Sequence, residues 1–300
     1  MPTFSLFVSK LSFEGLRDCL VDRFIEQIEL YNDVRIAFQK DGRSVYRTTD
    51  IYDAPLWGDK DYEGIAYEKP SPIPHDHKKV FMKLIDRAKD SVLSEEELLD
   101  IFYETEEDVI SILAVSPPDS VAPIQQIESE RKAQLHFRFF VGKYPVSEEQ
   151  FAFEVERLFD KIVFTTEIEN CLRTLEGGLD KFSVSIIRAL EHLNDSFPQY
   201  HLPTQRKASL KRLSSESGFE TTPEGNPSAE RKKELSFLFD VPNENGDVVD
   251  TKCIYCEPHM KFSRSDASGD SHHYVNRLYF REQHPDFPGR LLIGHIGEHI

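Results

Sequence analysis

Histidine is concentrated near the end of the sequence, close to a pair of cysteines. Six of the eleven histidines lie between residues 259 and 300, and Cys253 and Cys256 stand just before them. Imidazole transfers protons near neutral pH and binds metals, and thiolate is a strong zinc ligand. This segment is therefore where the sequence points to chemistry.

One interpretation is a zinc site. Cys-x2-Cys at the end of a strand can supply two ligands to one tetrahedral ion, and His259 and His272 can supply the other two. There is no second Cys-x2-Cys pair in the chain. Residues three apart on a straight strand face opposite sides, so a structural role with Cys253 buried stays open.

A second interpretation needs no metal. Alternation along a strand places His259 and Lys261 on one face, where Arg277 from a neighbouring strand can join them, with His295 and His299 from the last segment. A histidine that moves protons and cations that hold phosphate are what RNA cleavage by an internal 2′-hydroxyl requires. The same set can bind phosphate without cleaving it, or the histidines can be structural.

Parts of this segment resemble the end of a group of bacterial proteins. The resemblance rests on three segments: Cys-Glu-Pro-His-Met-Lys at 256–261, Arg-Leu-Tyr-Phe at 277–280 and Gly-Arg-Leu-Leu-Ile-Gly-His-Ile-Gly-Glu-His-Ile at 289–300. They look like the tail of uncharacterised proteins found in mobile-element or phage-defence surroundings. The strand order is also similar to the small sheet of RelE-type ribosome-dependent RNase toxins. The resemblance covers about 45 of the 300 residues and implies a link to RNA.

The composition excludes several classes of protein. Hydrophobic residues make up 39% of the chain, which is too apolar for wholesale disorder. The apolar runs, such as 110–115, are far shorter than the roughly 20 residues of a membrane span, and no secretory signal is evident. Four dispersed cysteines do not make a disulfide framework. We expect a cytoplasmic protein without membrane contact.

The negative charge is uneven. Residues 1–200 carry 23 Lys and Arg against 38 Asp and Glu, whereas residues 201–300 carry 13 against 15. Because like charges repel, contact with a polyanion such as RNA is expected in the last third of the chain.

The periodicity of apolar residues predicts an α+β fold in three parts. A mixed α/β acidic domain spans 1–202, a flexible basic linker spans 203–233 and a small antiparallel β module spans 234–300. In the first domain we expect strands at 4–8 and 134–141, a helix at 13–31, and a hairpin of strands 34–38 and 44–47. Helices are expected at 75–90 and 94–113, after Ser147, and at 167–175 and 181–193. The module should contain five strands, at 236–241, 248–255, 261–263, 277–280 and 291–294.

The favoured hypothesis is a bacterial defence or toxin-system protein whose C-terminal module binds or cleaves RNA, while the acidic domain regulates it or docks a protein partner. The alternative is a non-enzymatic adaptor or sensor subunit, in which the acidic surface and the loop around Trp57 hold a partner and the module is structural, with or without zinc. A third hypothesis, a hydrolase that uses carboxylates of the first domain, lacks a distinctive spacing. The sequence leaves the oligomeric state open.

Overall fold

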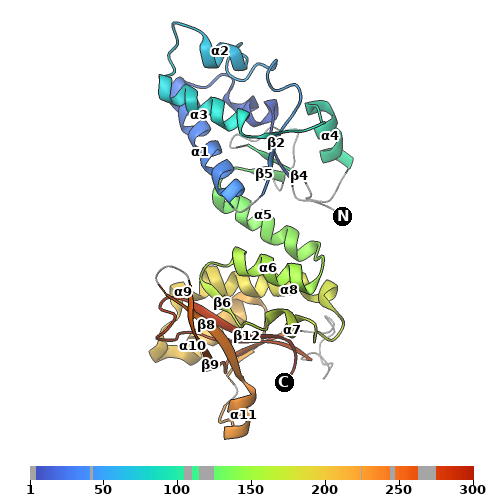
Figure 1. Cartoon of the computed structure of the whole chain (residues 1–300), viewed down its shortest axis with the longest axis vertical. Helices are drawn as coiled ribbons and strands as arrows, with labels where there is room; N and C mark the ends of the chain where they lie inside the picture. Colours follow the sequence, from blue (N-terminus) through green and yellow to red (C-terminus); the bar gives the residue numbers. More distant parts are fainter. Residues whose placement is uncertain are drawn as a thin grey trace. The chain divides into compact units, whose positions relative to one another are not determined.

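A computed structural model describes residues 5–40, 43–104, 110–114, 125–223, 225–243, 247–262 and 275–300. The chain divides into two compact units, Met1–Phe140 (unit 1) and Val141–Ile300 (unit 2), and the division falls within helix α5 (Glu130–Lys143) (Figure 1). The predicted α+β class is confirmed, because helices accompany a parallel sheet in unit 1 and a mixed sheet in unit 2. Within the described ranges, no helix combines the length and the apolar character that crossing a membrane requires.

Unit 1 is built on five parallel strands in the order β3-β2-β1-β4-β5. The strands are β1 (Ser5–Val8), β2 (Val45–Arg47), β3 (Lys89–Asp90), β4 (Ile110–Leu113) and β5 (Gln126–Ile127). The helices are η1 (Lys10–Leu16), α1 (Val21–Lys40), α2 (Tyr62–Tyr67), α3 (His75–Asp86) and α4 (Glu95–Glu104), followed by α5. Parallel neighbours need long crossovers, and helices lie in the connections from β1 to β2, from β2 to β3 and from β3 to β4.

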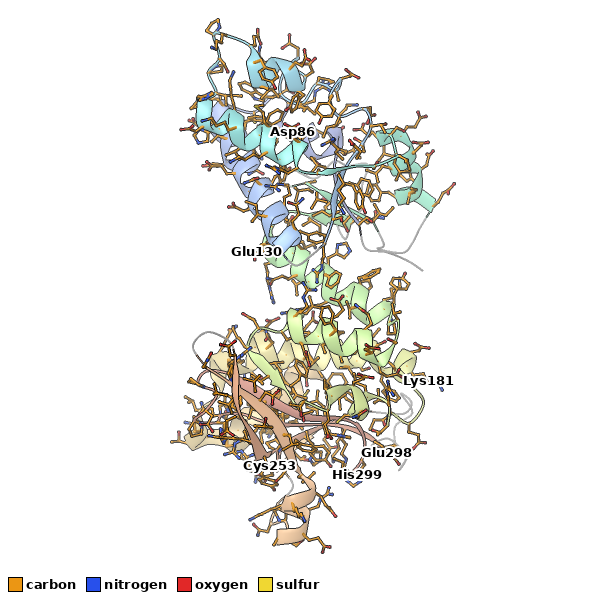
Figure 2. All side chains as sticks on the ribbon, viewed as in Figure 1. Asp86, Glu130, Lys181, Cys253, Glu298 and His299 are labelled. Atoms are coloured by element: carbon orange, nitrogen blue, oxygen red, sulfur yellow. The ribbon has the colours of Figure 1, made fainter. Side chains whose placement is uncertain are left out.

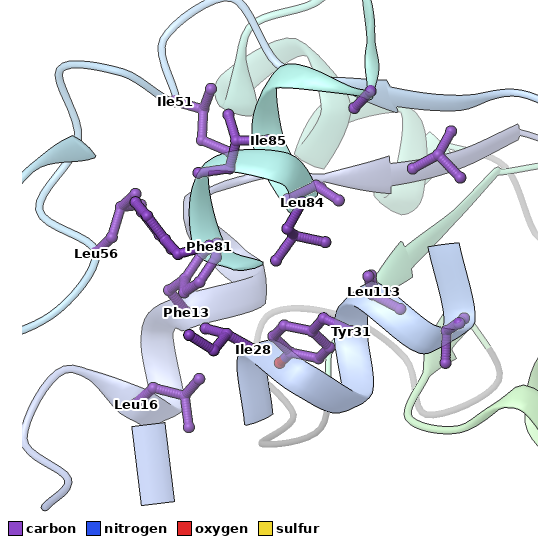
Figure 3. Close-up of a cluster of buried hydrophobic side chains, with 14 of the residues drawn as sticks. Phe13, Leu16, Ile28, Tyr31, Ile51, Leu56, Phe81, Leu84, Ile85 and Leu113 are labelled. Carbon is purple, nitrogen blue, oxygen red and sulfur yellow. The ribbon is translucent and has the colours of Figure 1, made fainter. Parts of the chain in front are cut away.

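Both faces are buried at the centre of this sheet. Leu6 and Val8 of β1 belong to a large cluster with side chains of η1, α1 and α3, part of which Figure 3 shows around Phe13 and Phe81. Phe7, between them in sequence, belongs to a second cluster with side chains of α4. Successive strand residues face opposite sides, so one short strand serves both cores.

Two predicted strands of unit 1 are wrong. Residues 34–38 lie in α1, where Val34 and Phe38 continue the buried helical spacing of Ile28 and Tyr31. The predicted hairpin therefore does not form, and Val45 pairs in parallel with Leu6 of β1. Residues 134–141 likewise lie in α5, and the predicted helix over 94–113 ends at Glu104, with strand β4 beginning at Ile110. The predicted turn at 41–42 lies outside the described residues.

Several predicted helix starts are confirmed. The Ser94 hydroxyl accepts a hydrogen bond from the Glu97 main-chain N–H at 3.3 Å, and the Glu97 carboxylate accepts from the Ser94 N–H at 2.8 Å. This is a reciprocal capping box, which Ser followed three residues later by Glu favours at the start of a helix. Ser147 caps α6 by accepting from the main-chain N–H of Gln150 at 3.2 Å.

Unit 2 is a five-stranded sheet in the order β6-β12-β11-β10-β7, with a separate two-stranded ribbon of β8 and β9. The strands are β6 (Ile162–Phe164), β7 (Thr221–Thr222), β8 (Ser236–Pro242), β9 (Val248–Tyr255), β10 (His259–Phe262), β11 (Asn276–Arg281) and β12 (Leu291–Glu298). The helices are α6 (Glu148–Leu158), α7 (Ile168–Leu172), α8 (Leu179–Glu191), the π-helix η3 (His192–Ser196), α9 (Phe197–Tyr200), η4 (Pro203–Gln205), α10 (Arg206–Ser217) and α11 (Ala229–Glu234).

The two faces of this sheet pack against different layers. On one face, Phe262 and Phe280 contact the rings of Phe182 on α8 and Phe197 on α9. On the other face, Tyr279 joins a cluster formed largely by the β8–β9 ribbon, which runs across the sheet in Figure 1. The sheet therefore has α8 and α9 on one side and the β-ribbon on the other.

The structure divides the chain differently from the predicted domains. The C-terminal strands do not form a module of their own, because β12 pairs in parallel with β6, in register Leu291 to Ile162. Nor is the predicted linker at 203–233 a bare connection. It contains α10, whose Leu210 and Leu213 are buried, and β7, which pairs with β10. The predicted five-stranded antiparallel sheet is in fact two sheets, since among the described residues β8 and β9 form a two-stranded sheet of their own.

Candidate functional site

Three adjacent strands of unit 2 bring most of the predicted residues together. In the antiparallel register, His259 of β10 lies opposite Tyr279 of β11, which lies opposite His295 of β12. Two residues further along β10, Lys261 lies opposite Arg277 of β11. Side chains that face each other in register, or stand two apart on a strand, share a face of the sheet. His259, Lys261, Arg277, Tyr279 and His295 thus share one face, which we call the polar face.

Tyr279 lies at the centre of the polar face. Its side chain is fully buried, and its ring centroid lies 5.1 Å from that of His259 and 6.1 Å from that of His295. The Tyr279 hydroxyl accepts hydrogen bonds from Arg277 Nη1 and from Arg231 Nη2, each at 3.3 Å. Two guanidinium groups therefore meet at one phenol oxygen.

The sequence did not reveal Tyr279 or Arg231 as site residues. Tyr279 stands two residues after Arg277 on the same strand, so the alternation that grouped His259 with Lys261 also groups these two. Arg231 comes from α11, within the segment predicted to be a linker, and no local pattern places it beside β11. Its position could be known only from the fold.

The cations of the polar face differ in their partners. Arg231 is partly exposed and binds the Glu234 carboxylate at 3.1 Å and the Ile300 main-chain oxygen at 2.6 Å. Lys261 binds the Glu220 carboxylate at 2.6 Å. Arg277 has no carboxylate partner among the described residues, and its Nε is buried without a hydrogen bond there. Arg277 is thus the cation on this face whose bonding is least satisfied.

The two buried histidines are engaged with the protein. His259 is 4% exposed, and its Nε2 lies 3.3 Å from the Thr222 hydroxyl of β7. His295 is 6% exposed, and its Nε2 donates to the Glu298 carbonyl at 2.8 Å. Burial lowers the pKa of His295, which favours the neutral ring. Neither ring is placed to exchange protons with a ligand in solvent.

His299 does not belong to the polar face. It follows β12, its side chain is exposed, and its main-chain N–H donates to the Val275 carbonyl at 2.6 Å. Figure 2 labels it beside Glu298 at the end of the chain. The predicted group of five residues is therefore a group of four, with Tyr279 and Arg231 added.

The structure does not present the two cysteines as a pair of ligands. Cys253, labelled in Figure 2, is exposed on β9. Cys256 is fully buried in the cluster between ribbon and sheet. Burial raises the pKa of the Cys256 thiol, which opposes the thiolate form that binds zinc. His272 lies outside the described residues. Within the described part of the chain, no group of three or more His, Cys, Asp or Glu side chains is arranged to hold a metal ion.

The glycines around His295 have a packing explanation. A Cβ atom at Gly294 would overlap the ring of Phe237 on β8, and one at Gly297 would overlap Thr174 and the Cys171 main-chain oxygen. Only glycine allows so close an approach without a shift of the backbone. The Gly-His-Ile-Gly run thus lets the ribbon and the residues around α7 approach β12.

Trp57 of unit 1 anchors its own loop. The indole stacks on Phe24 with ring centroids 5.3 Å apart, and its Nε1–H donates to the Cys19 carbonyl at 3.1 Å. The structure therefore shows Trp57 packed onto the core of unit 1, whereas the adaptor hypothesis expects its loop to hold a partner.

Comparison with known proteins adds no relative. No family model, no curated protein and no solved structure matches this chain.

Proposed function

We propose that the protein binds RNA through the polar face of unit 2. The observation that carries the proposal is the meeting of Arg231 and Arg277 at the Tyr279 hydroxyl, with Arg277 lacking a carboxylate partner among the described residues. Two like charges near one oxygen repel each other, and an anion between them would relieve the repulsion. Guanidinium groups bind phosphate through paired hydrogen bonds, which makes RNA phosphate a fitting ligand.

Binding rather than cleavage is the activity that these contacts support. A general acid or base must come within hydrogen-bonding reach of the reacting atoms. His259 and His295 are buried and engaged with Thr222 and Glu298, while Arg231 and Arg277 are partly exposed. In this proposal the histidines support Tyr279 from beneath, and the two arginines contact the ligand.

The charge distribution supports the same assignment. Residues 201–300 carry almost balanced charge, whereas residues 1–200 carry the large acidic excess. The acidic part would therefore repel RNA and leave the polar face as the place of contact. We propose that unit 1 docks a protein partner or regulates binding, and that the protein acts in a bacterial defence or toxin system.

The test is RNA binding at several salt concentrations. A labelled single-stranded RNA of about 12 nucleotides would be titrated with the wild-type chain and followed by fluorescence anisotropy. We expect Arg277→Ala to weaken binding about tenfold. The slope of the logarithm of the binding constant against the logarithm of salt concentration should fall by roughly the amount that one phosphate contact contributes. Recovery of intact RNA on a gel separates binding from cleavage.

The matched control is Arg173→Ala. Arg173 is an exposed arginine on the C-terminal side of α7, paired with Glu169, so its removal makes the same change in net charge and leaves both arginines at the Tyr279 hydroxyl in place. The control should bind within about twofold of the wild type if only a surface charge is lost. Equal losses in both variants, or no RNA binding by the wild-type chain, would refute the proposal.

A further inference from the structure

A pocket lies at the end of the β10–β11 pair, beyond the polar face. It has a volume of about 250 Å³ and lies between the α9–α10 connection, the end of β9 and the end of β11. Its lining includes His201, Arg206, Tyr255, Glu257, Arg281 and Glu282. This is smaller than the usual range for drug-sized ligands and suits one small planar molecule.

The charges in the pocket are balanced. Arg206 binds Glu257 at 2.8 Å and Glu282 at 2.6 Å, so one cation serves two carboxylates. Arg281 adds a second cation, and its Nε and Nη1 donate to the carbonyls of Gln283 and Tyr255. Two arginines and two glutamates cancel formally, so the pocket offers no net attraction to a phosphate. A neutral polar ligand fits this balance better than an ion.

The lining still offers groups that can bind such a ligand. Glu257 uses Oε2 for Arg206, and its Oε1 accepts no hydrogen bond within the described ranges. Arg281 has a second terminal nitrogen, Nη2, that makes no hydrogen bond to the residues described. His201 Nδ1 is buried and without a partner there, and its ring stacks on Phe197 with centroids 4.7 Å apart. An acceptor, a donor and an aromatic ring thus line one small space.

We propose that this pocket binds a nucleobase of the RNA. Bases are neutral and planar, they carry donors and acceptors on one edge, and proteins hold unpaired RNA bases by stacking and by contacts to that edge. Carboxylate and guanidinium groups are common partners of base edges. The inference rests on the proposed function, since it assigns a base to the same strand that would hold the phosphate.

The spacing along β11 is compatible with one continuous strand of RNA. Arg277 and Arg281 are four residues apart on β11, which corresponds to about 13 Å at the rise of an extended strand. A single-stranded ligand that places a phosphate at Arg277 could therefore place a nearby base at Arg281. The phosphate contact would supply binding energy without regard to sequence, and the pocket would distinguish bases.

The test compares RNA that carries bases with RNA that lacks them. Oligonucleotides of about 12 residues containing one type of base, and an abasic ribose-phosphate chain of equal length, would be titrated by fluorescence anisotropy. We expect the wild-type chain to bind its preferred base-bearing RNA about tenfold more tightly than the abasic chain. Glu257→Gln keeps one oxygen to pair with Arg206 and replaces the second oxygen by an NH2 donor. Gln283→Trp fills the pocket from an exposed position. Both should reduce that preference, and Gln283→Trp, which does not change the charge of the protein, should leave abasic binding unchanged.

The controls separate failure of the pocket from failure of the RNA site. Gln150→Trp makes the same substitution at an exposed position on α6 and should keep the preference. Arg277→Ala should weaken base-bearing and abasic chains alike. If the wild-type protein bound the base-bearing and the abasic RNA equally, the proposed base pocket would be wrong and the proposed phosphate site would be unaffected.

Free nucleosides decide the remaining case, in which no RNA chain binds. Adenosine, guanosine, cytidine and uridine would then be titrated separately by calorimetry. Binding of a nucleoside that is lost in Gln283→Trp would uphold the pocket as a nucleobase site although the proposed function had failed. Absence of nucleoside binding would overturn both proposals.

Discussion

The two faces of the sheet in unit 2 are made by alternate residues of the same strands, yet they differ in kind. The face toward the helices presents Met260, Phe262, Leu278 and Phe280, all of them buried. The face toward the ribbon presents His259, Lys261, Arg277, Tyr279 and His295. Apolar burial stabilises a fold directly, whereas buried polar groups cost free energy unless each finds a partner. The second face is therefore the one that stability alone does not explain.

The partners on the polar face show where function can lie. His295 donates to a carbonyl, Lys261 binds Glu220, and Tyr279 accepts from two arginines. These groups are satisfied within the protein. Arg277 differs from the other cations of this face, since among the described residues it has a buried Nε without a hydrogen bond and no carboxylate partner. An incompletely satisfied cation at a partly exposed position is what a binding site for an anion requires.

The largest effect on stability is expected on the apolar face. Phe280→Ala removes a fully buried ring that contacts Phe197, and the lost contacts and the cavity together should cost about 3–5 kcal/mol. Hydrogen exchange of peptides from unit 2, followed by mass spectrometry, would measure this loss. The fluorescence of Trp57, the only tryptophan, reports on unit 1 and serves as an internal control. A loss below about 1 kcal/mol would mean that this face is not the core of unit 2.

A smaller, pH-dependent effect is expected from His295 on the polar face. Its folded pKa is lowered by burial, so below its unfolded value of about 6.5 the unfolded chain binds more protons than the folded one. Stability is therefore complete above that pH and falls as the pH drops toward the folded pKa, by at most about 1.4 kcal/mol per pH unit. His295→Gln cannot titrate and should show a shallower loss of protection in unit 2. Parallel pH profiles for the two proteins would contradict the buried neutral ring.

Much of unit 2 could be predicted from local pattern, and much of unit 1 could not. Strands β8 and β9 are antiparallel neighbours, and the bounds predicted for them agree with the structure to within a residue. In unit 1, β1 pairs with β2 and β4 across intervening helices, and these strands are three or four residues long. Short strands buried on both faces carry little alternation, so the strand at 4–8 was predicted but the pattern at 34–47 indicated a hairpin that does not form.

The candidate site was partly predictable for the same reason. Alternation grouped His259 with Lys261, and the order of the strands brought Arg277 and His295 beside them. Arg231 reaches Tyr279 from α11, and β6 joins β12 from more than a hundred residues away, through tertiary contacts that no local pattern encodes. The burial of the histidines also depends on the ribbon, whose approach requires Gly294. The sequence could predict which residues lie near one another on these strands, but it could not predict whether their side chains are exposed or buried.

The smallest effect on stability, and the most informative, is expected from Arg277→Met. Methionine replaces the aliphatic part of the arginine and removes a charge that has no carboxylate partner among the described residues, so the free energy of unfolding should change by no more than about 0.5 kcal/mol. Tyr279 keeps its hydrogen bond from Arg231, which limits the cost of the change. RNA binding by the same variant should fall about tenfold, because the phosphate contact is lost. Loss of binding without loss of hydrogen-exchange protection would assign Arg277 to the ligand. A loss above about 2 kcal/mol with unchanged binding would assign it to the fold, and the polar face would then be structural throughout.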